Sequence, residues 1–153
     1  MNNINFLLPD AVFLSGEAKT PEEAIREAGD LLERANISLP SYTDAMVEAF
    51  HSLGSYIVLA PHIAMPHARP DDRVLKAGFG LLRLNQPIKF GHPENDPVKI
   101  LIPLAGVNNH GHIEMLQILA SVLSEPMNID ILLSSSDVNE IISLFDLGNI
   151  TEE

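Results

Sequence analysis

Histidine is the only plentiful reactive side chain in this sequence. The chain has six histidines and no cysteine, which excludes thiol catalysis, a disulfide framework and a zinc ribbon. A neutral imidazole nitrogen can accept a phosphoryl group, move a proton or bind a metal ion. The six positions are His51, His62, His67, His92, His110 and His112. Two of them, His67 and His112, have neighbours that favour a chemical role.

His67 follows a short segment that is enclosed by two prolines. A residue before a proline is pushed towards extended geometry, so the segment 63–65 between Pro61 and Pro66 is expected to be a short strand. His67 then falls where a loop begins, and the small Ala68 comes next. Such a position holds a side chain at the end of a sheet and leaves room for another molecule to approach.

His112 is expected in the first turn of a helix that contains Leu116 and Leu119. Backbone N–H groups in a first turn have no partner within the helix, and they favour anions. The same dipole disfavours an imidazolium, so a neutral His112 that donates one N–H fits this position. The alternative is that His112 is simply an exposed residue of that turn.

The hydrophobic spacing predicts helices on both sides of a central region. The run Thr20-Pro21-Glu22-Glu23 has the pattern of a capping box ahead of a helix over 21–35. A second helix, over 41–53, is expected to end at Gly54 and to bury Ala45, Met46, Ala49, Phe50 and Leu53. Three C-terminal helices are expected to begin near Asn109 or His110, at Pro126 within 124–133, and after a capping Ser136.

The central region contains short apolar runs that indicate strands. They lie at 11–14, 56–59, 63–65, 77–84 and 98–104, with a turn at 95–97 before the last of them. Because helices precede, interrupt and follow these strands, we expect one α/β domain over residues 1–153. It would contain a mixed β-sheet of about five strands, flanked by helices on both faces.

The charge and hydropathy of the chain restrict its partners. Nine basic and 21 acidic residues give a net charge of −12, so nucleic acid and anionic membranes are poor partners for a charged patch. A small basic protein suits this chain better. Residues 1–10 contain no Lys or Arg, and no apolar stretch reaches transmembrane length. We therefore expect a cytoplasmic protein.

The segment around His67 resembles a known active-site signature. The string Ile63-Ala64-Met65-Pro66-His67 is similar to that of the enzyme IIA components of the bacterial phosphoenolpyruvate-dependent sugar phosphotransferase system, in the mannitol/fructose superfamily. Further matches look most like the ascorbate-specific branch, and they include Arg69-Pro70, Val74, Lys76, Gly78 and Asn95-Asp96-Pro97-Val98. With the helix starts at 21–24 and 112–120, the resemblance spans nearly the whole chain.

The resemblance implies a phosphotransferase that relays phosphate during carbohydrate uptake, without a metal or a cofactor. His67 would accept the phosphoryl group from phospho-HPr, and His112 would stabilise it. The group would then pass to an enzyme IIB component, on a Cys in the ascorbate type, in association with the membrane enzyme IIC. Arg69 would contact the phosphoryl group or a partner, although an exposed loop arginine is an equal alternative. His110 is the reserve for the role of His112.

Two positions depart from the family pattern. Ala68 stands where Gly is common after the phosphorylated histidine, and a left-handed backbone there would be strained. His51 stands about where mannitol-type members have an Arg, which moves the match away from mannitol.

Two other functions compete with the relay. One is a stand-alone regulatory domain of the same fold, which would bind partners according to its phosphorylation state. The other is a histidine-based metal site. His110 and His112 are two residues apart, however, and metal ligands that share one helix face are spaced i, i+4.

Overall fold

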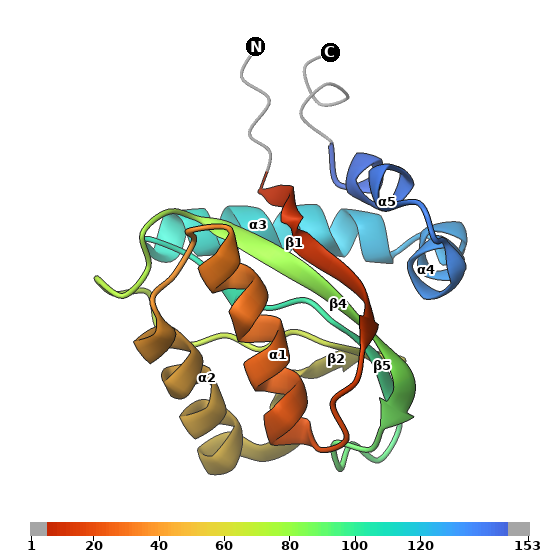
Figure 1. Ribbon diagram of the computed structural model, residues 1–153, viewed down its shortest axis with the longest axis horizontal. Coiled ribbons are helices and arrows are strands. Elements are labelled where there is room, and N and C mark those ends of the chain that lie inside the picture. The colour runs from red at the N-terminus through yellow and green to blue at the C-terminus, as the bar shows by residue number, and fades with distance from the viewer. Residues whose placement is uncertain (1–5, 147–153) are drawn as a thin grey trace.

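The structure is a computed structural model, and it describes residues 6–146. Within these residues, six strands form one sheet in the order β1-β4-β5-β3-β2, with β6 paired to β4 (Figure 1). The strands are β1 (Leu7–Gly16), β2 (Val58–Ala60), β3 (Ile63–Ala64), β4 (Gly78–Ile88), β5 (Val98–Leu101) and β6 (Leu104–Ala105). The pairs β1–β4 and β3–β5 are parallel and the other pairs are antiparallel, so the predicted mixed sheet is confirmed.

Helices cover both faces of this sheet, as the sequence predicted. Figure 1 shows α1 and α2 in front of the sheet and α3 behind it. The helices are α1 (Pro21–Arg34), α2 (Pro40–Leu53), α3 (Asn109–Leu123), α4 (Pro126–Ser134) and α5 (Val138–Leu144), with a 3-10 turn, η1 (Gly54–Ile57), after α2. The core between the layers is apolar, and Ser38 and Thr43 are its buried polar residues within 6–146.

Several strand boundaries differ from the prediction, most of them near prolines. Strands β1 and β4 both run past a proline, Pro9 and Pro87, where the pairing register shifts, and such irregularities tolerate the missing N–H. The predicted strand 98–104 is instead interrupted before Pro103, so the chain forms β5 and then β6. The predicted strand 56–59 begins only at Val58, because η1 occupies the preceding residues.

The predicted buried face of α2 was right at Met46 and wrong at Leu53, while Ala45, Ala49 and Phe50 are half-buried. Its buried residues are Tyr42, Thr43, Met46 and Val47, whereas Leu53 is 63% exposed. The reason is a close approach of α1 to α2. Gly29 of α1 lies against the Thr43 side chain, and a Cβ at Gly29 would collide with it. This contact turns the Tyr42–Thr43 side of α2 inward, which a count of apolar side chains does not detect.

The predicted cap of α1 is confirmed, whereas the starts of α3 and α5 are capped by residues that the sequence analysis did not name as caps. Thr20 Oγ1 accepts from the Glu23 N–H at 3.2 Å, while Glu23 Oε1 accepts from the Lys19 N–H at 2.9 Å rather than from that of Thr20. Asn108 caps α3 by accepting from the Gly111 N–H at 2.7 Å. Asp137, and not the predicted Ser136, caps α5, whose first helical residue comes one position later than expected.

Candidate active site

The backbone on both sides of His67 is held by the sheet. Strand β3 ends at Ala64, whose carbonyl accepts from the Ile102 N–H at 2.8 Å. The Leu104 N–H donates to the Pro66 carbonyl at 2.9 Å, and the Met65 N–H donates to the Ile57 carbonyl at 2.8 Å. His67 therefore leaves a strand end whose position is fixed by two neighbouring segments. Ala68 does not have a positive φ, so the strain considered for this position is absent.

The His67 ring is oriented by its own backbone. Nδ1 lies 2.8 Å from the Met65 carbonyl oxygen. A carbonyl can only accept, so Nδ1 carries the proton and donates it. The lone pair of the neutral ring is then on Nε2, on the side away from this bond. The ring is partly buried, and the Tyr56 ring meets it edge-on with centroids 5.6 Å apart.

His112 comes to the same place from α3. The centroids of the His67 and His112 rings are 5.4 Å apart, and the ring planes are inclined by 51°. Gly106 makes room for this approach, since a Cβ there would lie 3.0 Å from the His112 Cβ. His112 thus lies in the first turn of α3, as predicted, and its side chain points towards His67 at the end of β3.

The environment of His112 favours a neutral ring. Its Nδ1 is buried and has no hydrogen-bond partner among the described residues. Burial, and secondarily the neighbouring His67, lower the pKa of His112 below its ordinary value of 6.5. A buried N–H without an acceptor is rarer in proteins than a buried acceptor without a donor. We therefore assign the proton of the neutral ring to Nε2, which leaves Nδ1 as the unpaired acceptor.

Both histidines line one open cavity of about 640 Å³ between α2, the loop after His67 and the start of α3. Tyr56, Arg69 and Arg73 also line it. Arg73 is paired with Asp71, whereas Arg69 is exposed and has no hydrogen bond or ion pair within residues 6–146. The cavity therefore contains two facing imidazoles and one free guanidinium, a group suited to an anion.

The other histidines lie away from this cavity. His110 is exposed and does not line it, so His112 is the one that reaches His67. The Nδ1 of His62 donates to the Pro97 carbonyl at 2.8 Å, and the Nδ1 of His92 accepts two backbone N–H groups. His51 contacts Glu22 through Nε2 at 3.1 Å on the outer surface. Three of these rings thus have structural partners.

Tyr42 and Tyr56 are site residues that the sequence analysis missed. Tyr56 was assigned to a strand, but it lies in η1 and faces His67. Tyr42 is fully buried in α2, and its hydroxyl contacts the backbone of Ala68. The signal for Tyr42 was weak. It consisted only of a polar-tipped aromatic side chain in the first turn of a helix, where a solvent-facing residue is equally common.

The described residues were also searched for a metal site and for a membrane span. Within residues 6–146, no three His, Asp or Glu side chains form a group that could hold a metal ion. No single helix of this range is long and apolar enough to cross a membrane, and α3 and α4 reach that length and composition only as a pair bent by 94°.

Known proteins are similar to this chain in sequence and in fold. Residues 5–147 match the family model of the phosphoenolpyruvate-dependent sugar phosphotransferase system, EIIA 2. The chain is 38% identical over 141 residues to the ascorbate-specific PTS system EIIA component of Escherichia coli strain K12, with 91% of each covered.

Solved structures agree. The crystal structure of IIA mannitol from Escherichia coli is 33% identical, with a TM-score of 0.77, covering 89% of this chain and 96% of that one. The Escherichia coli complex of enzyme IIAMTL with phosphorylated enzyme IIBMTL is 32% identical, with a TM-score of 0.78, covering 89% and 94%. The chain therefore belongs to the EIIA 2 family of the phosphoenolpyruvate-dependent sugar phosphotransferase system, whose members are phosphotransferases that act through a histidine.

Proposed function

We propose that this chain takes a phosphoryl group from phospho-HPr on Nε2 of His67 and passes it to an enzyme IIB component. The observation that carries the proposal is the His67 hydrogen bond to the Met65 carbonyl, which directs the lone pair of Nε2 away from the backbone. His67 lines a cavity that is open to a protein donor, and Nε2 is the ring nitrogen that has a lone pair to offer. It forms the new P–N bond while the bond between phosphorus and the donor breaks, and that electron pair leaves with the donor.

In this proposal, His112 stabilises the transferring group. Phosphoryl transfer proceeds through a loose transition state with charge on the peripheral oxygens, so the site must mainly position and stabilise. A neutral His112 that carries its proton on Nε2 donates to one of these oxygens. The N-terminus of α3, which carries His112, adds a partial positive charge on the same side.

Arg69 is the cation available to the bound phosphoryl group or to a partner. It lines the cavity next to His67, and no other described side chain neutralises it. The chain as a whole has a net charge of −12, which favours a basic donor. Arg69 therefore contributes a local positive charge within an acidic surface.

The relatives support enzyme IIB as the onward acceptor. The ascorbate-specific name of the Escherichia coli relative supports an ascorbate-type or related uptake system. For that type, the family resemblance implies a Cys as the acceptor on enzyme IIB. The complex of enzyme IIAMTL with phosphorylated enzyme IIBMTL supports direct contact with enzyme IIB. We place this step in the cytoplasm, in functional association with the membrane enzyme IIC.

Reconstitution tests the acceptor. The chain is incubated with labelled phosphoenolpyruvate, enzyme I and HPr, and the label is located by peptide mapping. His67→Ala is expected to abolish labelling and to retain the fold, because the ring lies at the mouth of a cavity rather than in the core. His110→Ala is the matched control and is expected to label fully.

Full labelling of His67→Ala would overturn the proposal. Addition of enzyme IIB then separates the relay from the regulatory alternative. A relay loses its label to enzyme IIB, whereas a regulator that binds partners according to phosphorylation state keeps it.

A further inference from the structure

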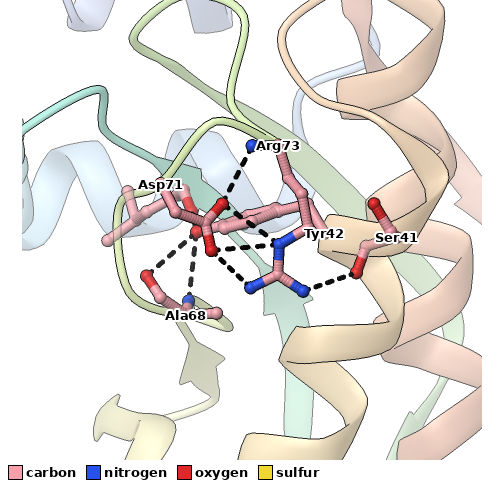
Figure 2. Close-up of polar contacts among 6 residues, drawn as sticks. Ser41, Tyr42, Ala68, Asp71 and Arg73 are labelled. Carbon is pink, nitrogen blue, oxygen red and sulfur yellow. Dashed lines mark hydrogen bonds and ion pairs between the residues drawn. The ribbon is translucent and has the colours of Figure 1, made fainter.

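The hydroxyl of Tyr42 joins three segments around the acceptor loop. Tyr42 lies in α2 and is fully buried. Its hydroxyl lies 2.6 Å from the Leu104 carbonyl oxygen. It also lies 3.0 Å from the Ala68 nitrogen and 3.2 Å from the Ala68 carbonyl oxygen (Figure 2). The single hydroxyl proton goes to Leu104 at the shortest of these distances, and the Ala68 N–H donates to the hydroxyl oxygen.

These bonds hold the residues on both sides of His67 to one point of β6. The Leu104 N–H donates to the Pro66 carbonyl at 2.9 Å. The Leu104 carbonyl accepts from Tyr42, whose oxygen accepts from Ala68. Pro66 and Ala68 are thus both connected to Leu104, one directly and the other through the Tyr42 hydroxyl. The His67 ring bonds to the Met65 carbonyl, so its orientation depends on the backbone course over 65–68.

The same loop is attached to the start of α2 at a second place. The Arg73 guanidinium pairs with Asp71 and donates to the Ser41 carbonyl at 3.3 Å (Figure 2). The Leu39 N–H donates to the Arg73 carbonyl at 2.9 Å. These attachments are five residues beyond Ala68. They therefore fix the far end of the loop and leave the position next to His67 to Tyr42.

We propose that Tyr42 is a positioning residue for the phosphoryl acceptor, because its hydroxyl fixes the backbone after His67 and thereby keeps Nε2 of His67 directed into the cavity. The proposal rests on the proposed role of His67, and it assigns to Tyr42 no contact with the phosphoryl group. Burial raises the pKa of Tyr42 to about 12, so the hydroxyl keeps its proton throughout the neutral range.

Tyr42→Phe tests the inference, because it keeps the buried ring and removes only the hydroxyl. Thr43→Val is the matched control. Thr43 is the next residue of α2 and is also buried, but its hydroxyl donates to Glu33 at 2.8 Å and does not contact the loop. Both variants lose one buried hydroxyl, so a general loss of stability affects both.

The first measurement is the 15N NMR signature of the His67 ring. In the unmodified chain and in Thr43→Val we expect one tautomer with the proton on Nδ1. In Tyr42→Phe we expect a shift towards a mixture of tautomers, because the ring loses its fixed relation to Met65. This signature is independent of any transfer reaction.

The second measurement is the rate of His67 phosphorylation by phospho-HPr. Misplacement of a reacting group by about 1 Å reduces a rate by up to about 100-fold, so we expect a kcat about 10- to 100-fold lower for Tyr42→Phe, with KM unchanged. A Tyr42→Phe variant that matches Thr43→Val in both measurements would overturn the inference. Failure of the unmodified chain to accept phosphate would overturn the proposed function instead. The NMR comparison would still test whether the Tyr42 hydroxyl positions the His67 ring.

Amide hydrogen exchange in the unmodified chain gives a test that needs no variant. The Ala68 N–H has the Tyr42 oxygen as its acceptor, so its exchange is expected to be on the order of 100-fold slower than that of an unprotected loop amide. Exchange of the Ala68 amide at the unprotected rate would show that the hydroxyl does not hold the loop, and it would overturn the inference even if Tyr42→Phe failed to fold.

Discussion

His67 and His112 have the same side chain but opposite environments. The Nδ1 of His67 has a carbonyl partner, whereas the Nδ1 of His112 is buried without one. The first arrangement leaves an oriented lone pair on Nε2, and the second leaves a neutral ring with an N–H to donate. In the proposed relay, these differences assign His67 as the acceptor and His112 as the stabiliser.

Substitution of His112 tests this division. His112→Gln keeps an N–H donor but cannot hold phosphate stably, so we expect labelling at His67 to persist and transfer to enzyme IIB to slow. His112→Ala loses the donor altogether, and we expect a further loss, of about 100- to 1,000-fold relative to the unmodified chain. Rapid-quench transfer in both directions measures both variants. If His112→Gln takes no phosphate while His67→Gln does, the two roles are reversed.

At the scale of elements, the first turn of α3 determines where His112 lies. Asn108 caps this turn by accepting from the Gly111 N–H. We expect Asn108→Ala to lower the free energy of unfolding by about 1 kcal/mol and also to slow onward transfer, since a frayed first turn no longer holds His112 beside His67.

Thr20→Ala is the matched control for the α3 cap. Thr20 caps α1 in the same way, but it does not line the cavity. It is expected to lower the free energy of unfolding by a similar amount and to leave transfer rates unchanged. Urea unfolding and rapid-quench transfer on the two variants make the comparison. Equal transfer rates in the two variants would show that the cap acts on stability alone.

The elements that carry the histidines were predictable because their signals are local. The prolines around 63–65 and the helix spacing after His112 are both properties of neighbouring residues, and the mixed sheet with helices on both faces followed from the order of such segments. The role of Tyr42 and the inward face of α2 were not predictable in this way. They depend on the contact of Gly29 with Thr43 and on Leu104, which is 62 residues from Tyr42.

At the scale of the whole molecule, the two-residue strand β6 is the place where the layers meet. Its Leu104 binds the backbone beside His67 directly and through Tyr42 of α2. Gly106, which follows β6, packs against His112 of α3. Strand β6 pairs with β4, which also pairs with β1 and β5. A short strand next to Pro103 thus connects both helical layers to the candidate site.

The pH dependence of global stability reports on this assembly. The pKa of His112 is lowered in the folded chain, so between that pKa and its ordinary value of 6.5 the unfolded state binds more protons than the folded state. The stabilising contribution of neutral His112 is therefore fully present above pH 6.5. It is lost as the pH falls below 6.5 and through the lowered pKa of His112. The pKa values of the exposed Glu22 and Asp71 are also lowered, but from 4.5 and 3.8, so their contributions are lost only at lower pH.

We therefore expect the difference in free energy of unfolding between the unmodified chain and His112→Gln to shrink as the pH falls below 6.5, while the two chains lose stability in parallel in the carboxylate range. Urea unfolding of both chains at intervals between about pH 8 and pH 4 measures this difference, since the ordinary pKa values of His and Glu lie within that range. A difference that grows on acidification would mean that the folded chain stabilises the imidazolium. It would remove the neutral donor on which the proposed role of His112 depends.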